Sequence, residues 1–320
     1  MEQHALTRPA RTPIVSPGGI DLHEQDMTAA FSADVTLDAA QQRLAQIGQW
    51  LPIDGNSEST LGELLDQNST GALRLGYGAW RDLLLGAQFR NGRGELITAG
   101  GRTVKNVAGY DLTKFMVGQH GQFGRLVTLT TRTYRRPAGA IALHLPPDPA
   151  RINLLLPSPL RPQWALLTAE GLHLGYLADE RTLEFYNRQL PTLSPTTMVA
   201  QSVDDDITMR HSLWCAFGEP SFRATVPPVK VLEFAAKAGV SAWTADASFG
   251  IVVGAVAAQR RALCAAADAV GGKVMFSDEA RPPMTGAEAA LVDRLKTAFG
   301  APVPSPGTPR VGYGEGSIEG

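Results

Sequence analysis

Three glycine-rich turns between Thr60 and Leu129 constrain the fold of this chain more than any other feature. They cover residues 71–78, 100–109 and 118–124. Glycine adopts positive φ angles and lets the backbone approach a ligand closely, so amide N–H groups can face an anion such as a pyrophosphate. A single turn of this kind is typical of an ordinary loop. Three of them at expected strand–helix junctions indicate a ligand-binding region.

The spacing of these glycines excludes two common nucleotide-binding motifs. The third turn has the pattern Gly118-x-x-Gly121-x-x-Gly124 and follows a helical stretch. A Rossmann fingerprint instead begins with G-x-G directly after a strand. The chain also lacks the G-x-x-x-x-G-K-[ST] sequence of a phosphate-binding P-loop.

Apolar periodicity predicts an α+β fold in which helices cover one face of a sheet. The pattern at Thr28–Ala33 predicts a strand, and the helix expected at Leu37–Ile47 has Thr36 or Asp34 as its capping residue. Further helices are expected at 61–66, 111–117, 180–190, 229–238, 258–270 and 287–299. Further strands are expected at 83–90, 95–98, 126–134, 140–145, 164–168, 172–177, 241–247, 250–255 and 273–276.

Composition narrows the classes of function. The chain has 44% hydrophobic and 19% charged residues, as a globular protein does, and its net charge is −2. No basic stripe is present, which argues against a nucleic-acid partner. No apolar run is long enough to span a membrane, and Met1–Pro13 lacks the apolar core of a secretory signal. We therefore expect a cytoplasmic protein that associates with membranes only through partners.

The cysteines and histidines do not form a recognisable metal or catalytic motif. Cys215 and Cys264 are far apart and lack metal-ligand spacing, so no metal site is expected. Their apolar neighbours predict that both thiols are buried. The six histidines are scattered, and only His120, inside the third glycine turn, is a candidate base. No catalytic residue is identified.

Several strings then resemble one family of flavoproteins. The most specific is Lys105-Asn106-Val107-Ala108-Gly109-Tyr110-Asp111, within residues 100–112. Residues 60–62, 68–78 and 118–124 follow in the family's motif order, and 226–228, 242–253 and 295–307 resemble its second half. The chain resembles the FAD-binding subunit of glycolate oxidase and, more broadly, the vanillyl-alcohol-oxidase or PCMH-type FAD-binding family.

The resemblance implies two domains and a bound FAD. It predicts an irregular leader at 1–26, a PCMH-type FAD-binding domain at 27–138, an antiparallel-sheet cap domain with helices at 139–300, and a flexible tail at 301–320. The FAD domain is expected to be truncated, because the family normally carries about a hundred more residues, including a pyrophosphate loop, before residue 28. By carry-over, the cofactor-binding residues are Thr60, Leu61, Gly62, Gly71, Lys105, Tyr110, Gly118, Gly121 and Gly124.

The implied function is that of a subunit in an FAD-dependent oxidoreductase complex acting on glycolate or another small 2-hydroxy acid. Catalysis would reside mainly in a partner subunit that contains FAD, accompanied by an iron–sulfur subunit. Gln119, His120, Gln122 and Phe123 depart from the family pattern in the third turn. The alternative is a flavin-free scaffold of the same fold, which assembles the complex after loss of the pyrophosphate loop.

Overall fold

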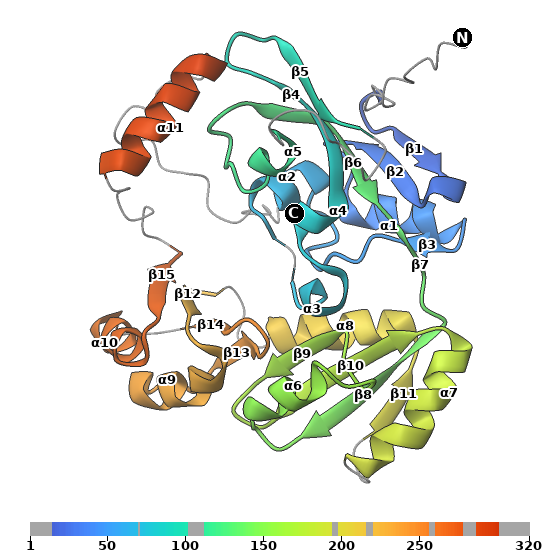
Figure 1. Ribbon diagram of the computed structural model, residues 1–320, viewed down its shortest axis with the longest axis vertical. Helices are drawn as coiled ribbons and strands as arrows, with labels where there is room; N and C mark the ends of the chain where they lie inside the picture. Colours follow the sequence, from blue (N-terminus) through green and yellow to red (C-terminus); the bar gives the residue numbers. More distant parts are fainter. Residues whose placement is uncertain are drawn as a thin grey trace, which may run out of the picture. The chain divides into compact units, whose positions relative to one another are not determined.

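The computed structural model describes residues 15–69, 71–101, 112–193, 198–215, 220–255, 260–277 and 286–300, with the side chains of Met198 and Glu288 excepted. These residues form two compact units (Figure 1). The first comprises the chain up to Arg136 together with a returning segment at 286–300, and the second begins at Pro137.

The first unit is built on a five-stranded antiparallel sheet with the strand order β1-β2-β6-β4-β5. Every neighbouring pair is antiparallel, and β4 and β6 are joined with two register shifts. The strands are β1 (Ile20–His23), β2 (Thr28–Ser32), β6 (Arg125–Arg132), β4 (Leu84–Arg90) and β5 (Leu96–Gly100). A separate two-stranded sheet joins β3 (Gln49–Trp50) to β7 (Tyr134–Arg135).

One face of the five-stranded sheet is apolar and packs on the helices. Phe31 of β2, Leu129 of β6 and Phe89 of β4 point to this face and are fully buried. They join a core with α1 (Leu37–Ala45) and α2 (Leu61–Asp66). Alternation of side chains along each strand places a different set of residues on the opposite face.

The two core helices begin where the sequence predicts. The side chain of Thr36 accepts a hydrogen bond from the Ala39 amide, so Thr36 and not Asp34 caps α1. Thr60 and Glu63 form a reciprocal capping box at the start of α2. The unit also contains the short helices η1 (Glu24–Asp26), α3 (Arg74–Tyr77), α4 (Trp80–Leu83) and α5 (Leu112–Phe115).

The helix α11 (Gly286–Phe299) packs on the first unit, although its sequence was assigned to the second domain (Figure 1). Phe299 lies 5.6 Å from Phe115, 5.9 Å from Phe89 and 6.1 Å from Phe123 between ring centroids. The guanidinium of Arg93 donates to the carbonyls of Thr297 and Ala298, at 3.3 and 3.4 Å. A cation at this position satisfies terminal carbonyls of the helix and complements its dipole.

The second unit contains an eight-stranded antiparallel sheet with the order β11-β8-β10-β9-β13-β14-β12-β15. All neighbouring pairs in it are antiparallel. The strands are β8 (Gly139–Leu145), β9 (Trp164–Leu167), β10 (Leu172–Ala178), β11 (Met198–Gln201), β12 (Phe222–Thr225), β13 (Trp243–Asp246), β14 (Ile251–Gly254) and β15 (Lys273–Phe276). Together with the first unit, this confirms the predicted α+β fold with a large antiparallel sheet.

Helices lie on both faces of this sheet, not on one. Tyr186 of α7 (Glu180–Gln189) packs against Tyr176 with ring centroids 5.0 Å apart, and Arg260 of α10 (Arg260–Val270) lies over Phe276, so both helices cover the same face. The opposite face carries α8, because Trp164 there donates to Asp206. The helices of the unit are α6 (Ala150–Leu155), α7 (Glu180–Gln189), η2 (Leu190–Thr192), α8 (Val203–Trp214), η3 (Pro228–Lys230), α9 (Val231–Ala238) and α10 (Arg260–Val270).

The sequence did not predict α8, since its buried stripe is partly charged. Val203, Asp206 and Arg210 are the buried residues, at positions i, i+3 and i+7. Asp206 pairs with Arg210 and also accepts hydrogen bonds from Trp164 at 3.0 Å and Gln201 at 3.3 Å. A search for apolar residues at helical spacing therefore misses this helix.

The prediction that both cysteines are buried is wrong. Cys215 and Cys264 are exposed. Cys215 follows the last residue of α8, and its Sγ lies 3.8 Å from Nε2 of His211. Cys264 lies on α10 beside the buried stripe of Leu263 and Ala267 but faces away from it. Apolar neighbours in sequence do not decide which side of a helix faces the core.

Candidate functional site

The turn at Thr60–Gly62 uses its backbone amides inside the protein. The amide of Thr60 donates to Glu63 Oε2 at 2.9 Å, that of Leu61 to the carbonyl of Val35 at 2.8 Å, and that of Gly62 to the carbonyl of Ala33 at 2.9 Å. A Cβ atom at Gly62 would lie 2.7 Å from the Ala33 carbonyl oxygen. The close approach that requires glycine here is therefore between helix α2 and the end of strand β2.

Gly71 also has a structural requirement. Its φ angle is +67°, and a Cβ atom would lie 2.2 Å from Cβ of Asp54. The carboxylate of Asp54 accepts a hydrogen bond from the amide of Leu73 at 3.1 Å, which fixes the turn. Both the left-handed backbone and the contact with Asp54 exclude other residues.

Hydrogen bonds to helix α2, and one from the side chain of Gln119 within the turn, close the third turn. The amide of Gly118 donates to the Leu65 carbonyl at 3.0 Å, and that of Gly121 donates to Asp66 Oδ1 at 3.0 Å. The buried side chain of Gln119 donates to the carbonyl of Gly124 at 2.7 Å. Two predicted cofactor-binding amides in this turn are thus engaged within the chain.

His120, the candidate base, sits in this turn with a positive φ of 51°. Its amide approaches the carbonyl of Asp66 at 3.3 Å. Burial raises the pKa of the Asp66 carboxyl, and the amide of Gly121 and the nearby imidazole of His120 oppose that rise. The contacts of the turn are those of a loop held in place by Asp66.

Two of the predicted cofactor-binding residues, Lys105 and Tyr110, lie outside the described residues. The most specific string of the family resemblance lies with them, since residues 102–111 are not described.

A surface that sequence reasoning did not single out is the second face of the five-stranded sheet. Thr28 and Ser32 of β2 lie beside Thr128 and Thr130 of β6, and Gln88 of β4 follows in the same layer. All five side chains are small or polar, and all are buried. We call this set the polar sheet face.

Three hydroxyls of the polar sheet face have no hydrogen-bond partner among the described residues. They belong to Thr28, Thr128 and Thr130. Buried polar groups in proteins are nearly always hydrogen-bonded, so an orphaned cluster points to a partner other than the described residues. The signal in the sequence was the period-two pattern of Thr128, Leu129 and Thr130, which predicted the strand but not what its polar side faces.

The polar sheet face fits a flat, polar cofactor such as a flavin nucleotide. Its hydroxyls can donate to the carbonyl, ring-nitrogen or phosphate acceptors of such a cofactor. A bound flavin would supply hydride and electron acceptance. The residues of this face would orient it and exclude water, without taking part in proton transfer.

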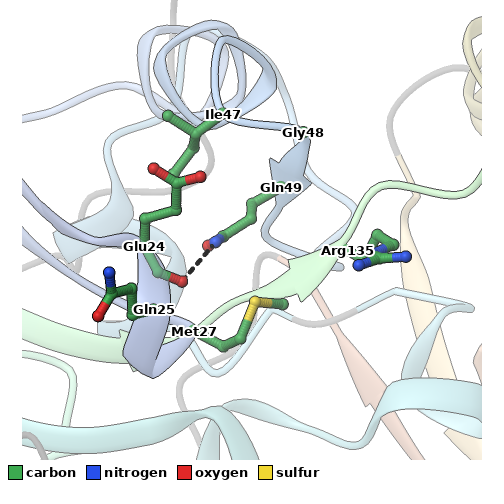
Figure 2. Close-up of a pocket in the computed structure, with 7 residues that line it drawn as sticks. All are labelled: Glu24, Gln25, Met27, Ile47, Gly48, Gln49 and Arg135. Atoms are coloured by element: carbon green, nitrogen blue, oxygen red, sulfur yellow. Dashed lines mark hydrogen bonds between the residues drawn. The ribbon is translucent and has the colours of Figure 1, made fainter.

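A recess in the first unit is a separate feature (Figure 2). It measures about 240 Å³. Figure 2 shows the buried amide of Gln49 at its wall, donating to the carbonyl of Glu24 at 2.9 Å. The oxygen of that amide accepts from Thr133 at 2.5 Å. The lining residues are Glu24, Gln25, Met27, Ile47, Gly48, Gln49 and Arg135.

The described residues contain neither a metal site nor a membrane-spanning helix. No group of three or more His, Cys, Asp or Glu side chains there is arranged to hold a metal ion. None of the described helices combines the length and the apolar character that crossing a bilayer requires.

Part of the first unit is similar to a known family. Residues 17–100 match a family model described as an FAD binding domain. This part of the chain is therefore similar to an FAD-binding domain. It includes β1, β2, β4 and β5 and the helices α1 and α2.

The curated relatives are similar over part of their length. The glycolate oxidase subunit GlcE of Escherichia coli (strain K12) is 36% identical over 34% of this chain and 31% of the relative. The glycolate oxidase subunit GlcD of Bacillus subtilis (strain 168) is 33% identical over 37% and 26%, respectively. D-2-hydroxyglutarate dehydrogenase of Stutzerimonas stutzeri (strain A1501) is 30% identical over 39% and 28%. The matches thus span less than a third of these relatives.

Solved structures extend the likeness of fold to most of the chain. Alkyldihydroxyacetonephosphate synthase has a TM-score of 0.61 over 87% of this chain and 63% of its own, at 13% sequence identity. At that identity the likeness concerns the fold alone. The FAD-binding-domain region and the large antiparallel sheet thus occur together in a known architecture.

Proposed function

We propose that this chain is an FAD-binding-type subunit of a glycolate or 2-hydroxy-acid oxidase complex. The observation that carries the proposal is the polar sheet face, because its orphaned hydroxyls lie in and beside the region that matches an FAD binding domain. The relatives that share this region include two glycolate oxidase subunits and a D-2-hydroxyglutarate dehydrogenase. A small 2-hydroxy acid would be oxidised by the complex, with this chain assisting.

The same proposal assigns partners and further contacts. Catalysis would lie mainly in an FAD-containing partner subunit, joined by an iron–sulfur subunit. Lys105 and Tyr110 would contact the flavin from the string that resembles the family. The glycines at 62, 71, 118, 121 and 124 would shape the cleft through packing. Three of their amides, those of Gly62, Gly118 and Gly121, are already bonded to Ala33, Leu65 and Asp66.

A second function has an observation in its favour. Five amides that could face a pyrophosphate, those of Thr60, Leu61, Gly62, Gly118 and Gly121, all donate to groups of the chain itself. A scaffold that assembles the complex without binding flavin would have such a structure. In that case the fold would be retained for contacts between subunits.

The absorption spectrum of the purified chain separates the two functions. We expect flavin bands, at close to one flavin per chain, in protein purified alone or co-expressed with its genomic neighbours. The double variant Thr128→Val/Thr130→Val keeps the side-chain shape and removes two orphaned hydroxyls, so it should bind FAD less tightly. Thr225→Val, on the exposed side of β12, is the matched control.

Each outcome has a clear meaning. A colourless protein, even with excess FAD and the partners present, would contradict the flavin-binding function and favour the scaffold function. If the protein is yellow but the threonine substitutions leave its affinity for FAD unchanged, the polar sheet face is not part of the FAD site. Co-purification with the two partner subunits would support the complex in either case.

A further inference from the structure

One end of the polar sheet face carries two nitrogen-rich side chains in a single row. His23 of β1 is directly opposite Thr28 of β2, and Thr28 is directly opposite Arg132 of β6. Directly opposed residues of antiparallel strands point to the same face of a sheet. The row therefore places an imidazole and a guanidinium on either side of the Thr28 hydroxyl.

The imidazole of His23 is held in place by a carboxylate. Its Nε2 lies 3.2 Å from Oδ2 of Asp21, two residues earlier on the same face of the edge strand. Ile20 and Leu22, between them, pack against the apolar core, which fixes the side to which Asp21 and His23 point. This contact involves Nε2, so Nδ1 is directed away from Asp21.

Arg132 and Thr28 complete the row. Thr28 is buried, and its hydroxyl is one of the three orphaned groups of the polar sheet face. Arg132 is half-buried and has no ion-pair partner among the described residues. A guanidinium binds the oxygens of a carboxylate or phosphate through two parallel hydrogen bonds, and a neighbouring hydroxyl adds a third donor.

We propose that His23, Thr28 and Arg132 form a binding site for the anionic oxygens of a ligand, a phosphate or a carboxylate. Arg132 supplies the charge and the paired donors, Thr28 donates its hydroxyl, which has no partner among the described residues, and His23, held beside Asp21, lines the site at the edge strand. The inference rests on the proposed function in one respect, that the polar sheet face is the ligand side of the sheet. It does not require that the ligand is FAD.

The test uses the full chain, freed of any flavin, and two small probes. Inorganic pyrophosphate represents a dinucleotide phosphate, and glycolate represents a substrate carboxylate. Binding of each is measured by titration calorimetry for the wild type, Arg132→Gln, Arg132→Lys and His23→Gln. Arg135→Gln removes the same charge from an exposed arginine of β7, outside the five-stranded sheet, and is the matched control.

We expect at least one probe to bind and Arg132→Gln to weaken it roughly ten- to hundredfold, as loss of charge-assisted hydrogen bonds does. Arg132→Lys should recover part of the affinity, and Arg135→Gln should leave it unchanged. Preference for pyrophosphate identifies a phosphate site, and preference for glycolate a carboxylate site.

Two results overturn the inference. One is that neither probe binds to a wild-type chain shown by circular dichroism to be folded. The other is that Arg132→Gln binds pyrophosphate, glycolate and FAD as tightly as the wild type. If FAD fails to bind while pyrophosphate binds through Arg132, the flavin function falls and the anion site stands. If FAD binds equally well to wild type and Arg132→Gln and no probe responds, the anion site falls and the flavin function stands.

Discussion

At the scale of single residues, the orphaned hydroxyls make a prediction about stability in the absence of any ligand. Thr130→Val removes a buried group that has no partner among the described residues. We expect the free energy of unfolding of the flavin-free chain to stay the same or rise by up to about 1 kcal/mol. Urea unfolding followed by circular dichroism measures this change.

Thr133→Val is the control for that substitution. Thr133 is equally buried but donates to Gln49 Oε1 at 2.5 Å. Its replacement leaves the Gln49 carbonyl oxygen without its donor and should cost about 1–2 kcal/mol. Equal losses for the two variants would show that the Thr130 hydroxyl has a partner in the folded protein.

A second prediction at this scale concerns acid stability. His173 stacks on His144 across β10 and β8, with ring centroids 4.6 Å apart. Burial, and then the charge of His144, lower the pKa of His173 from 6.5 to about 4. Between these two values the unfolded chain binds a proton that the folded chain does not, so stability falls as the pH drops from about 6.5 towards 4.

The variant His173→Gln should flatten that dependence. We expect the difference in melting temperature between pH 7 and pH 5 to be smaller in the variant than in the wild type, as measured by differential scanning calorimetry. His211→Gln, at the exposed end of α8, controls for the removal of an exposed imidazole from the same unit. An undiminished difference in His173→Gln would assign the acid sensitivity to other groups.

At the scale of elements, helix α8 depends on a charged pair where a core helix usually has an apolar one. Arg210→Met would leave the carboxylate of Asp206 buried without its cation. Removal of one partner from a buried ion pair costs about 3–5 kcal/mol. We expect a loss of that size in the urea unfolding of the second unit.

Replacement of both partners tests the cause of that loss. Asp206→Asn combined with Arg210→Met keeps an oxygen for the Trp164 indole and removes both charges. It should be more stable than Arg210→Met alone. If the double variant is no better, the loss comes from packing of the arginine side chain and not from an unpaired charge.

Helix α11 offers a second element-scale prediction. Phe299→Ala removes three aromatic contacts between this helix and the first unit and should cost about 2–3 kcal/mol. Because Phe123 lies in the third glycine turn, hydrogen exchange of residues 118–124 should also become faster. Leu291→Ala, on the same helix but 55% exposed, should change neither measurement. Exchange that stays slow in Phe299→Ala would show that the turn is held without this helix.

The elements also show what the sequence could and could not predict. Strongly periodic segments were predicted well: strand β2, helix α2 and helix α10 occur where the pattern placed them, within two residues at either end. Helix α8 was missed because its inward stripe is charged. The role of α11 was missed because the partners of Phe299 lie far away in sequence, and periodicity carries no information about such contacts.

At the scale of the whole molecule, the family resemblance predicted the FAD-binding-domain region and the large antiparallel sheet. The site was harder to predict. Glycine signalled close backbone approach correctly, but at Gly62 and Gly71 the approaching groups are Ala33 and Asp54 of the chain itself. The polar sheet face could not be predicted from the sequence, because it depends on the register of the strands. Strand pairing brings Thr28 beside Arg132.

The first unit is completed by a segment that is synthesised after the second unit, which affects how the chain folds during translation. The strands of the first unit leave the ribosome well before Phe299, which completes the aromatic cluster around Phe123. At about 5–20 residues per second, translation of the intervening second unit takes roughly 10–30 s. For that time the nascent first unit presents Phe89, Phe115 and Phe123 without their last partner. This interval is when a chaperone would most readily engage the chain.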